Sequence, residues 1–174
     1  LGGVRAPPTS VPGTPEPVLG STVFVWVVAL AAGALVCTAV RETARRRWPA
    51  SVALAGGVGL AAVATWLVVR LVAWVPPWEY LAVPSAAVST AGFGWVAVTV
   101  QTLVPALALR RGLWTPLFPL AAATTLTGFV VLRVGGEIDG LFIYTILLAP
   151  LALVAQLLLA GGEFGLRRVV DGWR

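Results

Sequence analysis

The chain has 174 residues, a length that by itself fits one ordinary domain. Hydrophobic residues make up 59% of it, and with its 19 glycines about 70%, while charged residues make up only 11%. In soluble proteins the apolar share including glycine is about 45–50% and the charged share about 25%. A soluble domain of this size cannot bury so much apolar surface, so the composition predicts an integral membrane protein. It also excludes a disordered chain, a collagen-like repeat, a disulfide scaffold and a coiled coil.

The residue types that the chain lacks narrow its chemistry. It has no histidine and one cysteine, Cys37, which excludes His-ligated haem, imidazole zinc sites, Cys-clustered metals and histidine-activated nucleophiles. All 12 basic residues are arginine, so a lysine base is excluded as well. We therefore expect no metal, no cofactor and no enzymatic activity. Methionine is also absent, and we expect the chain to be a processed product or a fragment that lacks an upstream segment.

The chain divides into a proline-rich start, an apolar middle and a short tail. Residues 1–20 contain five prolines and predict an extended external segment. Long neutral stretches follow, each above the roughly 18–20 residues that cross a bilayer core of about 30 Å. We predict an all-α, polytopic transmembrane bundle over 21–162 and a cytoplasmic tail over 163–174. Its five helices are expected near 22–40, 50–73, 86–109, 116–134 and 140–160.

Arginine placement predicts the orientation. Nine arginines fall on one side of the predicted helices, in the turn after helix one, the turn after helix three and the tail. The positive-inside rule places that side in the cytoplasm and the N-terminus outside, in a multi-pass protein of the plasma membrane. The net charge of +5 is explained by anionic headgroups, so no nucleic-acid partner is expected.

The sequence also contains a weak internal repeat. Helices one and three begin with similar segments around Trp26 and Trp95, and helices two and four end with an aromatic residue four positions before Arg70 and Arg133. One interpretation is two tandem helical hairpins followed by one helix. The other is convergence, because aromatic residues and arginine gather at the interfaces of any membrane protein.

Small residues four positions apart predict close helix packing. They occur in helix one at Ala29, Gly33 and Cys37 and in helix two at Ala53, Gly57 and Ala61. Such stripes allow two helix backbones to approach closely. Because helix two also carries a glycine cluster at 56–59, we predict that it is the central helix.

The candidate ligand site lies in the third helix. Pro105 cannot donate to the backbone carbonyl of Gln101, and Thr102 lies beside it. A freed carbonyl next to polar side chains in the membrane interior fits a site for a small solute or a cation at Gln101, Thr102 and Pro105. The alternative is that Gln101 bonds to a neighbouring helix.

A second group of polar residues is expected at the external surface. Arg70 and Arg133 end helices two and four, where a cation complements the helix dipole. Acidic residues follow in the adjoining loops. They pair with the arginines or form an external ligand site, so the expected external polar cluster is Arg70, Glu79, Arg133, Glu137 and Asp139.

Three functions remain open. A component of small-solute or ion transport is favoured by the repeat and by the Gln101–Pro105 break. An accessory or scaffold subunit of a larger complex is favoured by the short loops. A membrane enzyme acting on a lipid is the third. The expected partners are the lipid bilayer and further membrane chains, either copies of this chain or other subunits.

Overall fold

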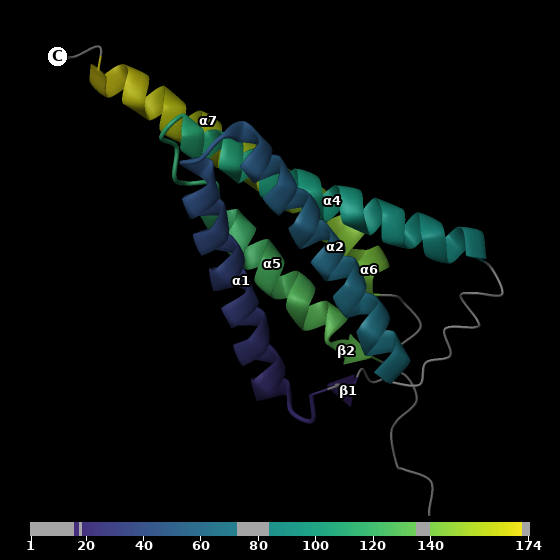
Figure 1. The fold of residues 1–174 in the computed structure, drawn as a ribbon. Coiled ribbons are helices and arrows are strands. Elements are labelled where there is room, and N and C mark those ends of the chain that lie inside the picture. The colour runs from purple at the N-terminus through teal and green to yellow at the C-terminus, as the bar shows by residue number, and fades with distance from the viewer. Residues whose placement is uncertain (1–15, 18, 73–83, 135–139, 172–174) are drawn as a thin grey trace, which may run out of the picture.

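The computed structural model describes residues 16–17, 19–72, 84–134 and 140–171. These residues form an all-α bundle, which confirms the predicted fold class (Figure 1). The fifth helix is continuous but changes character, with a π-helical segment near its start. The helices are α1 (Thr22–Ala44), α2 (Trp48–Val72), α4 (Pro84–Arg110), α5 (Leu117–Val131), and α6 (Gly140–Ile143), η1 (Tyr144–Leu148) and α7 (Ala149–Asp171) in succession.

Five helices are present in the described residues, but only four of them are long and apolar enough to span a membrane. The exception is α5, the fourth helix in chain order. It has 15 residues and is about 22 Å long, which is less than a hydrocarbon core of about 30 Å. The predicted span over 116–134 was therefore too long. The neutral run that predicted it begins at Gly112, which adopts a φ of 78°, so its first residues form the turn that leaves α4.

The far end of α5 leads into a short extended pair. Strand β1 (Glu16–Pro17) lies antiparallel to β2 (Arg133–Val134), with Glu16 opposite Val134. The first described residues of the predicted external segment are therefore paired with the strand that follows α5. Such a pair is too small to act as a sheet, but it holds the chain that enters α1 beside the chain that leaves α5.

The two most extensive helix contacts are α1 with α5 and α2 with α4. In the first, the stripe on α1 packs as predicted. Gly33 is buried, and a Cβ added there would lie 3.1 Å from the carbonyl oxygen of Ala121. Glycine is thus required for the close approach of α1 and α5.

The stripe predicted on α2 does not pack inside the protein. Ala53, Gly57 and Ala61 are all exposed, and a Cβ added at Gly57 would meet nothing within 4 Å. The helix instead turns Gly59 toward α4, where an added Cβ would lie 2.9 Å from the carbonyl oxygen of Trp95. The prediction of a central α2 was also wrong. Among the described helices, α4 and α5 hold the centre, since each contacts all the other long helices.

Helix pairing follows the order that two tandem hairpins would produce. If the hairpin α1–α2 is repeated as the hairpin α4–α5, then α1 corresponds to α4 and α2 corresponds to α5. The contact of α1 with α5 then corresponds to the contact of α4 with α2, and these are the two largest contacts in the bundle. Trp26 of α1 stacks on Phe129 of α5 at 4.1 Å, while Trp95 of α4 donates to the carbonyl of Gly56 in α2 at 3.1 Å. In the repeat Trp66 of α2 corresponds to Phe129 of α5, whereas Trp95 bonds to Gly56, ten positions before Trp66. The two tryptophans therefore do not occupy matching places, and the duplication itself remains a prediction.

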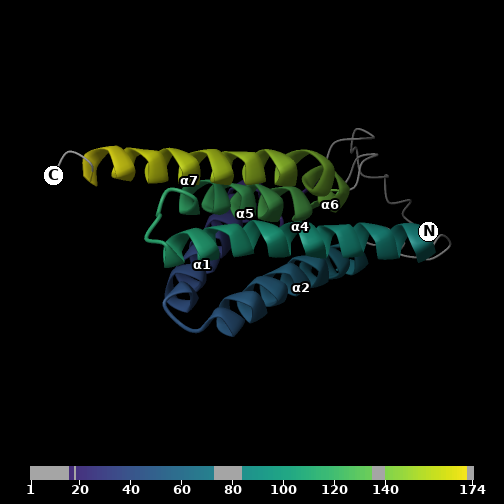
Figure 2. The same ribbon diagram turned by 90° about the horizontal axis from the view of Figure 1, so that it is seen from above.

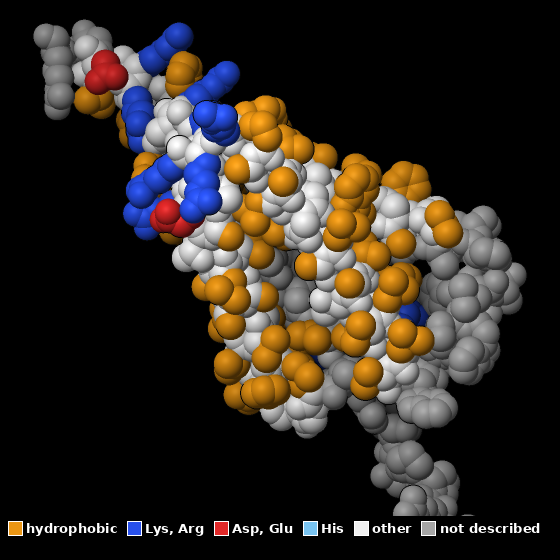
Figure 3. Space-filling view, viewed as in Figure 1, with side chains coloured by type: hydrophobic (Ala, Val, Ile, Leu, Met, Phe, Trp, Pro, Cys, Tyr) orange, Lys and Arg blue, Asp and Glu red, His pale blue; other side chains and the backbone are white. Residues whose placement is uncertain are grey.

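Charge is concentrated at one end of the bundle (Figure 3). The helix ends that meet there are those of α1, α4 and α7, together with the start of α2. We call this the arginine-rich end, and its described arginines are Arg41, Arg45, Arg46, Arg47, Arg110, Arg111, Arg167 and Arg168. Hydrophobic side chains cover most of the remaining surface in this view, as expected of a surface in contact with lipid.

The last helix reaches further than predicted. It continues to Asp171 instead of ending near 160, and it runs alongside α4 and α5 before projecting beyond them (Figure 2). Glu163 and Arg167, one turn apart, form a salt bridge of 2.6 Å that favours the helical conformation there. Most of the predicted tail is therefore a helical extension of α7.

Glu163 also connects α7 to the start of α5. Its Oε2 accepts hydrogen bonds from the backbone N–H groups of Trp114 at 2.8 Å and Thr115 at 2.9 Å. Arg167 donates to the carbonyl of Gly112 at 2.7 Å. Because α5 has no side-chain cap of its own, this carboxylate supplies the negative charge that favours a helix N-terminus.

Candidate intramembrane binding site

The backbone break at Pro105 is closed by another helix. Pro105 is buried within α4, and the carbonyl of Gln101 that it leaves without an intrahelical donor accepts from Gln156 Nε2 of α7 at 3.1 Å. Gln156 is fully buried. For the backbone carbonyl, the structure therefore supports the interhelical alternative rather than a bound solute.

The side chain of Gln101 is only partly satisfied. It is 3% exposed, and its Oε1 accepts a hydrogen bond from the hydroxyl of Tyr144. Its Nε2 has no partner among the described residues. This nitrogen also has almost no accessible surface of its own, so it is an unsatisfied donor inside the packed protein, and such a donor costs free energy.

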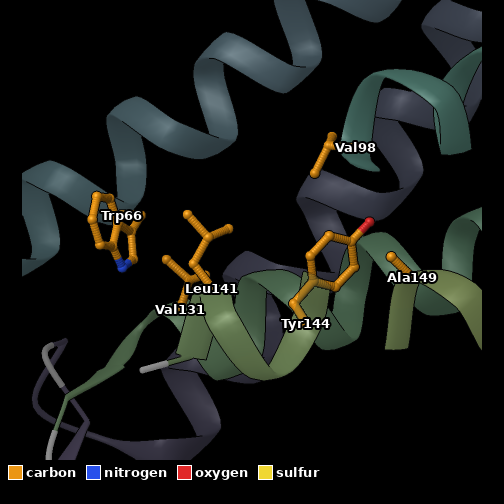
Figure 4. Packing of buried hydrophobic residues seen from close by; sticks show 6 residues of the cluster. All are labelled: Trp66, Val98, Val131, Leu141, Tyr144 and Ala149. Carbon is orange, nitrogen blue, oxygen red and sulfur yellow. The ribbon is translucent and has the colours of Figure 1, made fainter. Parts of the chain in front are cut away.

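Tyr144 is positioned by the π-helical segment and by an apolar cluster. It begins η1, ahead of Pro150, which cannot donate within the helix. Its ring lies among Val98, Leu141 and Ala149 (Figure 4). The wider hydrogen-bonding ring of η1 thus accommodates the proline, while the cluster holds the Tyr144 hydroxyl at Gln101.

A cavity of about 290 Å³ lies next to these groups. Its walls come from α1, α2, α4, α5 and the start of η1, and Gln101, Thr102 and Tyr144 are among its lining residues. Of the three predicted site residues, the structure brings Gln101 and Thr102 to this cavity. Pro105 is buried but is not part of the lining. The remaining lining is Val28, Ala29, Ala32, Val36, Val58, Ala61, Ala62, Thr65, Val98, Leu120, Thr124, Thr127, Gly128, Val131 and Leu132.

The threonines of the lining use their hydroxyl protons within their own helices. Thr102 donates to Val98 at 2.8 Å, and Thr124 and Thr127 donate in the same way to the residues four positions earlier in α5. Thr65 does so in α2. Together with the Tyr144 hydroxyl, which donates to Gln101, these bonds engage the hydroxyl protons of this lining.

The lining favours an uncharged ligand over an ion. Its residues are apolar or neutral, so the cavity offers a desolvated ion no compensating charge. A small uncharged solute would bury apolar surface there.

The predicted external cluster is only partly described. Glu79, Glu137 and Asp139 lie outside the described residues. Arg70 lies over the ring of Trp66 at 5.6 Å, and Arg133 lies over the ring of Phe129 at 5.2 Å. Each arginine thus contacts an aromatic residue one turn earlier on the same segment, a cation–π geometry that suits the membrane surface.

Sequence reasoning missed two members of the polar core, Tyr144 and Gln156. A signal for Gln156 was present, because it is the one amide side chain in the neutral run 140–162. Tyr144 had no comparable signal, since its position at a helix start resembles that of any interfacial aromatic residue.

Comparison of the chain with protein-family models, with curated proteins and with solved structures finds no match. Its function is therefore inferred from the geometry of the cavity and of its polar groups.

Proposed function

We propose that the protein is a membrane transport component, without enzymatic activity, that carries a small uncharged solute. The observation behind this proposal is the cavity of about 290 Å³, whose lining is apolar except for a few neutral polar side chains, among them the amide of Gln101. A solute bound there would occupy apolar space beside Gln101. Between solutes and ions, the neutral lining favours the solute.

The proposed orientation in the membrane rests on the charge distribution. We propose that the arginine-rich end faces the cytoplasm and that the chain enters α1 from the outside of a plasma membrane. In this orientation the cavity lies between the two surfaces, on the side of α5 that faces α1 and α2.

Flux measurements test the proposal. Vesicles containing the protein should take up glycerol, urea or a fluorescent long-chain ketone faster than protein-free vesicles, while the flux of Na⁺ and K⁺ tracers should stay at background. Gln101→Leu should reduce the accelerated uptake. Glu42→Gln, an exposed change on α1 away from the lining, is the matched control and should leave uptake unchanged. Equal uptake with and without protein for all three solutes would reject transport.

A second candidate is an accessory subunit of a larger membrane complex. It is favoured by the small-residue stripe Ala53, Gly57 and Ala61 on α2, which is exposed and at Gly57 leaves an added Cβ with nothing within 4 Å. Such a stripe suits close contact with another transmembrane helix. A mass measurement on the detergent-solubilised native assembly distinguishes the two candidates, since foreign subunits in fixed stoichiometry would favour the accessory role.

A further inference from the structure

Three arginines hold the arginine-rich end together. Arg110 of α4 donates to the carbonyl of Arg46, in the turn between α1 and α2, at 3.1 Å. Arg167 of α7 donates to the backbone of the turn after α4 at 2.7 Å. Arg41 of α1 lies over the ring of Trp114, in that same turn, at 5.0 Å. These contacts join the two turns and the last part of α7 into one surface.

Four other arginines add charge to this surface without holding the fold. They are exposed, and their guanidinium groups have no hydrogen-bond or ion-pair partner in the described part of the chain. The eight arginines of the end outnumber its described acidic residues, and one of the latter, Glu163, is already paired with Arg167. The surface therefore carries a positive charge that attracts anions from outside the described chain. The four arginines are Arg45, Arg46, Arg47 and Arg111.

The side chains around these arginines suit the surface of a membrane. Trp48 at the start of α2 and Trp114 in the turn after α4 are both exposed. On the last turns of α7, Phe164, Leu166 and Val169 are exposed as well. Tryptophan gathers at the level of the lipid headgroups, and exposed apolar side chains are unfavourable in water. The combination favours an anion that is part of a lipid over a free anion in water.

Arginine suits the phosphate group of such a lipid. Its planar guanidinium group donates two parallel hydrogen bonds to phosphate oxygens, and a cluster of basic residues directly beside membrane-spanning helices is typical of a site for anionic headgroups. In a zwitterionic headgroup the lipid's own ammonium group offsets the phosphate charge, whereas an anionic headgroup keeps it.

We propose that Arg45, Arg46, Arg47 and Arg111 form a binding surface for anionic phospholipids. Their guanidinium groups bind the headgroup phosphate, and the exposed Trp48 and Trp114 lie beside the glycerol region of the lipid. The inference goes beyond the proposed function, because lipid binding at this end requires neither the cavity nor transport.

Native mass spectrometry of the detergent-solubilised protein tests the preference for anionic lipid. The protein is titrated with phosphatidylglycerol and, separately, with phosphatidylcholine of the same acyl chains. One arginine near a headgroup changes the affinity roughly fivefold, so phosphatidylglycerol should bind at least about fivefold more tightly than phosphatidylcholine. Equal affinities for the two lipids would overturn the inference.

Single arginine variants test where the lipid binds. Arg47→Gln and Arg111→Gln, in different turns, should each weaken binding of phosphatidylglycerol about fivefold and leave that of phosphatidylcholine unchanged. Their melting points should stay those of the wild type, since neither guanidinium group has a partner in the described chain. Arg70→Gln removes the same charge at the opposite end of α2 and is the matched control. Equal weakening in this control would show a response to net charge and refute a site at the arginine-rich end.

Competition distinguishes a lipid from other anions. At constant ionic strength, glycerol phosphate should not displace phosphatidylglycerol, because it has a phosphate but no acyl chains. Displacement by glycerol phosphate would assign the surface to a soluble phosphate compound and overturn lipid binding. Displacement by oligoglutamate, which should also fail, would assign the surface to an acidic protein segment instead.

Discussion

Gln156 donates to the backbone carbonyl of Gln101 at 3.1 Å, and this is the carbonyl that Pro105 leaves without a donor. An amide side chain on α7 thus replaces a missing backbone hydrogen bond of α4. In lipid this replacement matters, because water is not available as an alternative donor.

The first prediction concerns this replacement. Gln156→Leu should destabilise the protein by about 1–2 kcal/mol, because it leaves the Gln101 carbonyl without a donor. In a Pro105→Ala background the same change should cost much less, since the restored N–H of residue 105 bonds to that carbonyl. Reversible unfolding in detergent or bicelles of the four proteins in this double-mutant cycle measures the difference. Additive effects of the two changes would contradict the pairing.

The contact of α2 with α4 gives the second prediction. Gly59→Ala should destabilise the fold by about 1–3 kcal/mol, since its Cβ would lie 2.9 Å from the carbonyl oxygen of Trp95. Gly57→Ala, two residues away and with nothing within 4 Å of its added Cβ, should be neutral or stabilising. Thermal melting of both variants in the same detergent makes the comparison. Equal melting points would show that the two helices lie further apart than described.

The helices were predictable from the sequence to a greater extent than their arrangement. Charge spacing and apolar length locate helices because they depend only on the bilayer. Which face of α2 packs depends on its partner, so the stripe with Gly57 and the position of Gly59 could not be distinguished by spacing alone. The same holds for the site. Gln101 is identified by the proline in its own helix, whereas its partner Gln156 is more than fifty positions away in the chain.

A third prediction concerns the connection between α7 and the start of α5. Glu163→Gln should accelerate hydrogen exchange at the Trp114 and Thr115 amides roughly tenfold, because a neutral amide is a weaker acceptor than a carboxylate. Glu42→Gln, an exposed change at the same end of the bundle, should not affect them. Hydrogen exchange followed by mass spectrometry measures the exchange of these two adjacent amides. Unchanged exchange in Glu163→Gln would mean that another group holds these amides.

The fourth prediction is the membrane orientation. Native Cys37 is first changed to alanine, so that labelling reports only an introduced thiol. A cysteine at Ser10, which lies outside the described residues, should react with a membrane-impermeant maleimide added to intact cells. A cysteine at Arg47, in the turn between α1 and α2, should react only after permeabilisation. The reverse pattern would invert the proposed orientation.

The shortness of α5 affects how the chain is inserted into a membrane. Its 15 residues bury less apolar surface in the bilayer than a helix that spans it completely. The acceptor of the Trp114 and Thr115 amides is Glu163, which is synthesised only after most of the last helix. During translation these donors have no acceptor in α5 itself, because that helix has no side-chain cap. We therefore expect the fourth segment to reach its final depth only after α7 has been inserted beside it, so that membrane integration of this bundle does not strictly follow the order of synthesis.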